Sequence, residues 1–398
     1  MKIAVDLRLL NYQYITGIGA YTIRLLEQLW LIKQQKEYDR VQIYAIGLKE
    51  DRLRKLQRRF AFLQELFTQS IDLPSYLGKM SIKNYKLLQV QIIFQAVFFE
   101  KVFDSRLIKF DYIILPQPRL LPAHPETKII TIFHDLYALI ERANFHFIQK
   151  MLDNPRIYKI LARVSSQIWG VSLTTCYDIE SYLKADKTKI KLAYSSLPKL
   201  KDLEKQFSSL DSEEIKLPNN YILAISGIEP RKNWYNLLLA HKLLQMQYSE
   251  YDSELVFLGK LINEDYYNQL IALIKKLNIK NVTWMLNVSE NNKEKLLSES
   301  KFVVYPSFYE GFGFPILEAF SFGKPVITSK ISSMPEVAKD SALYINPLNF
   351  KDIAAAIYVL LNDEKIYQLL KSKTKANLEA FSWSELNTRL KSLLSYKV

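Results

Sequence analysis

Apolar residues along the chain fall into short runs that alternate with longer amphipathic stretches. The first run is Ile3–Leu7, and a helix is expected from Ala20 to about Ile32, after a turn that contains Gly17 and Gly19. Further apolar runs in the first half are Val41–Gly47, Asp111–Pro116 and Lys128–Leu136. The later runs are continuously apolar, which is typical of parallel strands buried on both faces. Strands that alternate with helices predict an α/β fold with a parallel sheet.

The composition changes at about residues 196–219, where charged and polar residues dominate and prolines stand near both ends. This stretch predicts an interdomain linker. After it, five apolar runs predict five parallel strands: Tyr221–Gly227, Glu254–Gly259, Asn281–Leu286, Lys301–Pro306 and Lys324–Ser329. The sequence therefore predicts two Rossmann-like, doubly wound α/β domains at 1–195 and 220–382. A final segment, 383–398, is expected to form a helix that returns to the first domain.

Ligands of doubly wound sheets bind at the carboxyl ends of the strands, where the strand order reverses. With two such sheets facing each other, the cleft between them is the expected site. The length of 398 residues agrees with two domains.

Cysteine content and hydropathy predict the compartment. The single cysteine, Cys176, cannot form an internal disulfide, which favours a reducing environment. The N-terminus lacks a signal-peptide pattern, and the apolar run at 90–103 is too short and too interrupted by polar residues to span a bilayer. A cytoplasmic protein without a transmembrane segment is expected.

The net charge of +13 is concentrated in the first half of the chain. Residues 1–200 contain 30 Lys and Arg against 18 Asp and Glu, a net charge of +12. A basic first half of the chain either faces an anionic partner or carries solvated lysines without a partner. The run Arg52–Arg59 repeats basic residues at helical spacing, which fits a helix on the inner face of the cell membrane or a plain surface helix. Nucleic acid is not an expected partner.

The stretch YEGFGFPILEAFSFGKPVI, Tyr309–Ile327, predicts a glycine-rich turn followed by a short helix. Pro315 suits the first helical position, and the helix is expected over Ile316–Phe322. Gly323 is expected to close that helix in the left-handed conformation. A short helix is sufficient for this role, because the groups at its start, and not its length, would bind the ligand.

Two glutamates flank this turn. Gly311 and Gly313 allow the backbone to approach a ligand, and the amides at the helix start form a site for a phosphate or diphosphate. Glu318, about one turn into the helix, can accept hydrogen bonds from the vicinal hydroxyls of a ribose. Glu310 precedes the phosphate site, where a sugar would lie.

A second segment, SGIEPRKN, also follows a predicted strand of the second domain. It offers Arg231 and Lys232 to a diphosphate, because arginine binds phosphate bidentately and lysine acts as a point charge. Each loop alone is a common surface feature, and the presence of both in one domain favours a binding site. Downstream, Ser333 and Glu336 fit a capping box at a helix start, which is a structural role.

Together these segments resemble the retaining family 4 glycosyltransferases of the GT-B fold, the group 1, mannosyltransferase-like type. The resemblance rests on PSFYEGFGFPILEAFSFGKPVI, SGIEPRKNWYNLL and SSMPEVAKDSALYINP, and on TGIGAYT and FHDLYAL in the first half. It covers nearly the whole chain and is strongest from about 221 to 383. One departure is Asn287, where the family usually has glycine; asparagine tolerates a left-handed backbone, so the turn is expected to survive.

The resemblance implies a role for each matching residue. Catalytic positions would be Glu310, Arg231, Lys232 and His134, and donor-binding positions would be Gly17, Gly19, Gly311, Phe312, Gly313, Phe314 and Glu318. The amides of residues 311–314 would contact the donor sugar or its diphosphate, and the Gly17–Gly19 loop would close on the phosphates and the acceptor. For His134 the alternative is a buried, hydrogen-bonded core histidine.

The implied reaction is metal-independent transfer of a sugar from a nucleotide diphosphate sugar to a glycan or lipid-linked oligosaccharide, in surface polysaccharide biosynthesis. No Asp-x-Asp motif is present, and neither a metal ion nor a cofactor is expected. GDP-mannose is favoured as donor over UDP-glucose, UDP-N-acetylglucosamine or a deoxysugar nucleotide. The main alternative is a non-catalytic glycosyltransferase-like subunit that binds a glycan or a protein. A sugar epimerase or a phosphorylase would need residue sets that the sequence does not offer.

Overall fold

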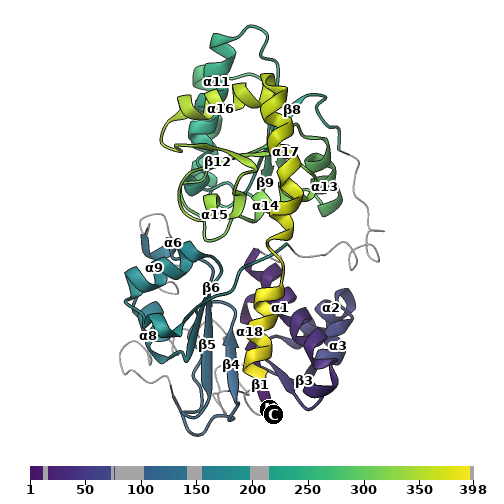
Figure 1. Cartoon of the computed structure of the whole chain (residues 1–398), viewed down its shortest axis with the longest axis vertical. Coiled ribbons are helices and arrows are strands. Elements are labelled where there is room, and N and C mark those ends of the chain that lie inside the picture. Colours follow the sequence, from purple (N-terminus) through teal and green to yellow (C-terminus); the bar gives the residue numbers. More distant parts are fainter. Residues whose placement is uncertain (12–16, 73–75, 77–102, 141–154, 198–214, 395–398) are drawn as a thin grey trace. The chain divides into compact units, whose positions relative to one another are not determined.

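The computed structural model of the chain describes residues 1–11, 17–72, 76, 103–140, 155–197 and 215–394 (Figure 1). The chain divides into two compact units. The first comprises Met1–Phe207 together with Trp383–Val398, and the second comprises Ser208–Ser382. Most of the predicted linker, and most of the apolar run at 90–103, lie outside the described residues.

The first unit contains a seven-stranded parallel sheet in the order β3-β2-β1-β4-β5-β6-β7. Its strands are β1 (Lys2–Asp6), β2 (Gln42–Ile46), β3 (Phe67–Ile71), β4 (Tyr112–Leu115), β5 (Lys128–Phe133), β6 (Gln167–Gly170) and β7 (Ile190–Leu192). The apolar runs predicted β1, β2, β4 and β5. Strands β3, β6 and β7 were not predicted, because they are short or contain polar residues.

The described helical segments of the first unit are η1 (Arg8–Asn11), α1 (Gly17–Lys33), η2 (Lys36–Tyr38), α2 (Glu50–Arg59), α3 (Phe62–Leu66), α6 (Tyr137–Ile140), α8 (Pro155–Val164), α9 (Leu173–Leu183), η4 (Lys187–Lys189) and α18 (Ser384–Leu394). Helix α18 packs against α1 and buries Leu386 and Leu390, so the last segment of the chain completes the core of the first unit (Figure 1).

The predicted turn at Gly17 and Gly19 is wrong, because both glycines lie in the first turn of α1. Glycine disfavours a helix interior by about 1 kcal/mol. The helix nevertheless extends to Gly17, since Tyr21 and Leu25 are buried and the Thr22 hydroxyl donates a hydrogen bond to the Ile18 carbonyl at 2.9 Å.

The second unit contains a six-stranded parallel sheet in the order β10-β9-β8-β11-β12-β13. Its strands are β8 (Tyr221–Ile225), β9 (Glu254–Gly259), β10 (Val282–Leu286), β11 (Val303–Tyr305), β12 (Val326–Ser329) and β13 (Ala342–Ile345). The five predicted strands are confirmed, and β13 is an addition to them. The predicted fold class, two doubly wound α/β domains, is confirmed for each unit by itself.

The helical segments of the second unit are η5 (Pro230–Lys232), α11 (Trp234–Gln247), α12 (Glu264–Leu277), α13 (Glu290–Glu299), α14 (Phe314–Ser321), α15 (Met334–Ala338), α16 (Phe350–Asn362) and α17 (Glu364–Glu379). One face of the sheet packs against α11, α12 and α16 in a core that includes Phe257, Trp234 and Ile357. On the other side, α14 packs against β11 and α17.

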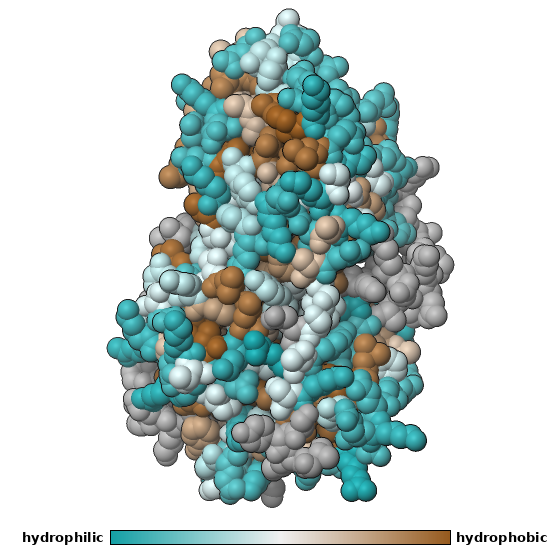
Figure 2. Space-filling model, in the orientation of Figure 1, coloured by the Kyte–Doolittle hydropathy of each residue, from teal (hydrophilic) through white to brown (hydrophobic). Residues whose placement is uncertain are grey.

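Hydrophilic residues predominate on the face seen in Figure 2, and apolar residues gather there in small areas. The predicted basic helix is confirmed as α2, with Arg54, Lys55, Arg58 and Arg59 exposed to solvent. None of the described helices combines the length and the apolarity that crossing a bilayer requires.

Candidate functional site

The second sheet reverses its strand order between β8 and β11, so the loops after these neighbouring strands lie at its switch point. The first loop carries η5, and the second comprises residues 306–313. Asn233 joins them, because its side-chain amide donates hydrogen bonds to the carbonyls of Pro306 at 3.0 Å and Pro347 at 2.7 Å. Its backbone is left-handed, with φ of 62°, which asparagine tolerates better than most residues.

Three of the predicted site residues meet at this switch point. The Glu310 carboxylate accepts hydrogen bonds on Oε1 from Lys232 Nζ at 2.6 Å and on Oε2 from Arg231 Nη1 at 2.7 Å. Arg231 Nε in turn donates to Glu229 Oε1 at 2.8 Å. We call Glu229, Arg231, Lys232 and Glu310 the switch-point cluster. Its central members, Glu310 and Lys232, are only 5% and 6% exposed.

The two cations decide the charge of Glu310. Burial alone would raise the pKa of this carboxyl, but Arg231 and Lys232 outweigh burial and lower the pKa to about 2. Burial, followed by the neighbouring Arg231, lowers the pKa of Lys232. The cluster therefore holds two carboxylates against two cations. An arriving diphosphate would have to share Arg231 and Lys232 with Glu310.

Two serines after β12 fix the loop that carries Glu310. Ser332 Oγ accepts from the Glu310 amide at 3.1 Å and donates to the Glu310 carbonyl at 2.6 Å. Ser333 Oγ lies 2.9 Å from the carbonyls of both Glu310 and Phe312. The predicted capping box is wrong, because Ser333 has no side-chain bond to the start of α15 and its hydroxyl faces the neighbouring loop instead. Both serines follow β12, the strand next to β11. Their position after the carboxyl end of this neighbouring strand is the one feature of the sequence that could have indicated them.

The loop ends in a left-handed glycine at the start of α14. Gly313 has φ of 103°, and a Cβ there would stand 3.3 Å from Ile316 Cδ1. The helix spans Phe314–Ser321, so Pro315 occupies the second helical position and not the first. The Phe312 ring packs against the rings of Phe314 and Phe381, which leaves only its backbone to face a ligand. Gly311 is buried in the same loop.

Glu318 belongs to a separate contact on the same helix. Its Oε1 accepts a hydrogen bond from Lys293 Nζ, on α13, at 2.6 Å, and Glu290 Oε2 lies 3.5 Å from the same nitrogen. Glu318 was predicted from the sequence and Lys293 was not, since no spacing along the chain relates α13 to α14.

The remaining predicted residues, Gly17, Gly19 and His134, belong to the first unit. His134 follows β5, its Nε2 lies 2.9 Å from the Pro116 carbonyl, and its ring meets Tyr21 edge-on with 4.8 Å between centroids. A carbonyl can only accept, so Nε2 carries the proton and Nδ1 is left as an acceptor. Burial lowers the pKa of His134 to about 4, so the imidazole is neutral at neutral pH.

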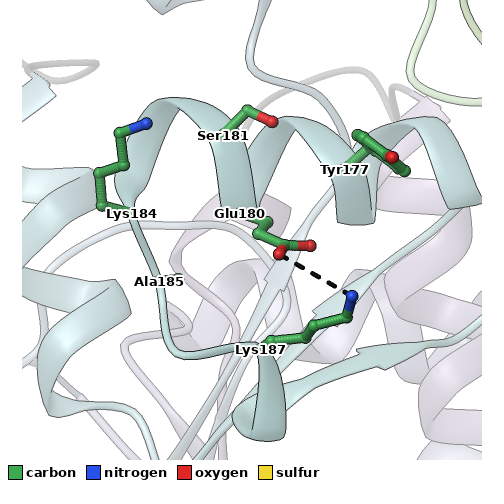
Figure 3. Close-up of a pocket in the computed structure, with 6 residues that line it drawn as sticks. All are labelled: Tyr177, Glu180, Ser181, Lys184, Ala185 and Lys187. Atoms are coloured by element: carbon green, nitrogen blue, oxygen red, sulfur yellow. Dashed lines mark ion pairs between the residues drawn. The ribbon is translucent and has the colours of Figure 1, made fainter.

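A surface hollow of about 480 Å³ lies elsewhere, at the C-terminal end of α9 in the first unit (Figure 3). It is lined by Tyr177, Glu180, Ser181, Lys184, Ala185 and Lys187. It contains none of the predicted site residues. Among the described residues, no three His, Cys, Asp or Glu side chains gather into a possible metal site.

The second unit resembles a known family. Residues 205–377 match the family model described as glycosyl transferases group 1. O-antigen chain mannosyltransferase B of Escherichia coli is 35% identical over 170 residues, which make up 42% of this chain and 44% of that protein. O-antigen chain mannosyltransferase RfbU of Salmonella typhimurium is 29% identical over 221 residues, 55% of each chain. The matches thus span about half the length of these relatives.

Solved structures share the fold of the whole chain. HepE of Anabaena, in complex with UDP and glucose, aligns over 100% of both chains with a TM-score of 0.65 at 16% identity. WaaG, a glycosyltransferase involved in lipopolysaccharide biosynthesis, aligns over 99% of this chain and 100% of its own with a TM-score of 0.62 at 13% identity. These neighbours have the GT-B fold, and the resemblance to group 1, mannosyltransferase-like GT-B proteins is confirmed.

Proposed function

We propose that the chain is a glycosyltransferase that moves a sugar from a nucleotide diphosphate sugar to a hydroxyl of a glycan or lipid-linked oligosaccharide. The observation that carries this proposal is the buried switch-point cluster, in which Glu310 is held between two cations. Such a cluster at the carboxyl ends of parallel strands, next to the start of α14, suits a ligand that combines a sugar with a diphosphate. The surface polysaccharide context comes from the O-antigen enzymes that the second unit resembles.

In this proposal each part of the donor contacts a different group of residues. Glu318 accepts hydrogen bonds from the ribose hydroxyls, and the amides of residues 311–314 face the diphosphate or the sugar. Glu310 accepts hydrogen bonds from hydroxyls of the donor sugar. Its low pKa supports this role, because an ionised carboxylate is an acceptor only and binds hydroxyl donors at any pH of interest.

Arg231 and Lys232 act on the leaving group. As the bond between the sugar C1 and the diphosphate oxygen breaks, negative charge gathers on the diphosphate, and prepositioned cations stabilise it. In the structure Glu229 and Glu310 together balance the two cations, so the diphosphate shares them and does not meet unpaired charges. This sharing keeps the ground-state binding of the diphosphate moderate and reserves stabilisation for the charge that develops in the transition state.

We propose that the transfer retains the configuration at C1. The acceptor oxygen attacks C1 on the face from which the diphosphate departs, and the acceptor proton passes to the departing phosphate oxygen. One C–O bond forms and one breaks, and no protein nucleophile or metal ion is required. His134, neutral with Nδ1 as an acceptor, would receive a hydrogen bond from a sugar hydroxyl in this scheme.

Among donors we favour GDP-mannose, because the relatives of the second unit include two O-antigen mannosyltransferases. The first unit, residues 1–195 with the returning helix at 383–398, would receive the acceptor, and 220–382 would hold the donor. The exposed basic residues of α2 would bring the first unit to the anionic inner face of the membrane, where a lipid-linked acceptor lies.

Separate variants test the assigned roles. Glu318→Ala should weaken nucleotide binding, because it removes the ribose acceptor. Arg231→Ala and Lys232→Ala should mainly lower turnover, by about 100-fold for the loss of one charge-stabilising group. Sugar transfer and nucleotide binding are measured side by side, with Lys276→Ala, an exposed lysine of α12, as the control. Wild-type rates and affinities in all three site variants would refute the site assignment.

A further inference from the structure

Lys293 ties α13 to the glutamate that the proposed function assigns to the ribose. Its Nζ lies 2.6 Å from Glu318 Oε1 and 3.5 Å from Glu290 Oε2. The side chains of Lys293 and Glu318 are 25% and 23% exposed, so the pair lies at the rim of the protein and not in its core. A ligand can therefore reach Glu318 while Lys293 stays bound to it.

The positive charge of Lys293 is stabilised at this contact. Burial alone would lower the pKa of Lys293, but Glu318 first and Glu290 second outweigh burial and raise the pKa. Lys293 is therefore protonated at neutral pH. Because an ammonium can only donate, the bond fixes Glu318 in the role of acceptor.

The contact leaves acceptor capacity on Glu318. An ionised carboxylate has about four lone-pair positions, and Lys293 takes one of them, on Oε1. Oε2 and the second lone pair of Oε1 can then accept hydrogen bonds from two neighbouring hydroxyls. A carboxylate held in one orientation binds such a pair of donors better than a freely rotating one, because less side-chain freedom is lost on binding.

We propose that Lys293 is a positioning residue of the donor site, which orients Glu318 to accept hydrogen bonds from the 2′- and 3′-hydroxyls of a nucleoside diphosphate. The site then selects ribonucleotide over deoxyribonucleotide donors. This inference rests on the proposed function of Glu318. A purely structural ion pair at the rim of the protein contributes little to stability, so the fold itself has little need of Lys293.

The test measures binding of GDP and UDP, and of the 2′,3′-dideoxy form of whichever binds better, by titration calorimetry. The proteins are the wild type, Lys293→Met, Lys293→Arg and Glu318→Gln, with Lys276→Met as the control for loss of a surface charge. We expect Lys293→Met to weaken binding of the ribonucleotide about 10-fold and Lys293→Arg to restore most of it. The dideoxy nucleotide, which lacks both hydroxyls, should bind wild type, Lys293→Met and Glu318→Gln alike.

Three results would overturn the inference. If Lys293→Met loses affinity equally for the ribonucleotide and the dideoxy nucleotide, Lys293 supports the unit as a whole and not the ribose contact. If Lys293→Met binds both as the wild type does, Lys293 has no part in the donor site. If the wild type binds neither GDP nor UDP, the proposed function falls together with this inference, whereas the first two results leave that function standing.

Discussion

At the scale of single residues, the site depends on how Glu310 is paired. Each of its carboxylate oxygens meets one cation, so its burial costs less than that of an isolated charge. The sequence predicted Glu310, Arg231 and Lys232 as parts of one site, with both cations assigned to the diphosphate. Their contact with Glu310 could not be predicted, because it depends on two loops that lie 78 and 79 residues apart in the chain.

The pairing of Glu310 predicts a pH dependence of stability. The folded-state pKa of about 2 lies below the ordinary 4.5, so the stabilisation is complete above about pH 4.5 and is lost as the pH falls toward 2. Its size is about 3 kcal/mol. Urea unfolding at a series of pH values should show that Glu310→Gln is less stable than the wild type at neutral pH and that the difference shrinks below pH 4.5. A difference that stays constant down to pH 2 would contradict the assigned pairing.

At the scale of elements, apolar patterning predicted most strands and missed some that are no shorter. Val326–Ser329 lies in a recognised apolar run, whereas Phe67–Ile71 has three consecutive polar residues in the sequence FTQSI, and Ala342–Ile345 was missed although it is as long as Val326–Ser329. Gly323 and Asn287 take the expected left-handed conformations, with φ of 64° and 56°. The capping box at Ser333 failed because a neighbouring loop offers the hydroxyl two carbonyl groups, and local spacing carries no information about such a partner.

The contacts of Ser333 give a prediction for the loop that carries Glu310. Ser333→Ala should destabilise the second unit by about 1–3 kcal/mol, because it removes the donor shared by two carbonyl groups in a buried site. Ser321→Ala is the control, because Ser321 is exposed at the end of α14 and its hydroxyl donates to a single carbonyl, that of Glu318, so its loss should cost less. Thermal unfolding of both variants checks this. Equal losses of stability would contradict the role assigned to Ser333.

At the scale of the whole molecule, the chain forms two units of the same architecture, and its last helix belongs to the first of them. The carboxyl-end rule for parallel sheets and the glycine-rich turn were enough to predict that Arg231, Lys232 and Glu310 lie at the same edge of one sheet. The contacts of Lys293, Ser332 and Ser333 were not predicted, because Lys293 lies on α13 and the two serines follow β12, and no spacing along the chain relates these segments to the residues that they contact. The roles assigned to His134, Gly17 and Gly19 remain predictions.

The packing of α18 against α1 predicts which unit loses stability when a buried leucine of α18 is truncated. Leu390 is 1% exposed in the core of the first unit, so Leu390→Ala should destabilise that unit by about 2–5 kcal/mol. Hydrogen exchange by mass spectrometry should show faster exchange in β1–β7 and unchanged exchange in β8–β13. Leu369→Ala, in the same C-terminal region but 55% exposed on α17, is the matched control and should change neither. Faster exchange confined to the second unit would contradict the assignment of α18.

The central claim is that the second unit binds a nucleotide diphosphate sugar. Its most direct test is the melting temperature of the full chain with GDP, UDP, dTDP and ADP, followed by the matching nucleotide sugars. A ligand that binds only the folded protein raises the melting temperature by mass action. We predict a clear rise with one ribonucleoside diphosphate, GDP for a mannosyltransferase and UDP for a different donor within the same class. No rise with any nucleotide would contradict the account and leave a non-catalytic, glycosyltransferase-like binding protein in its place.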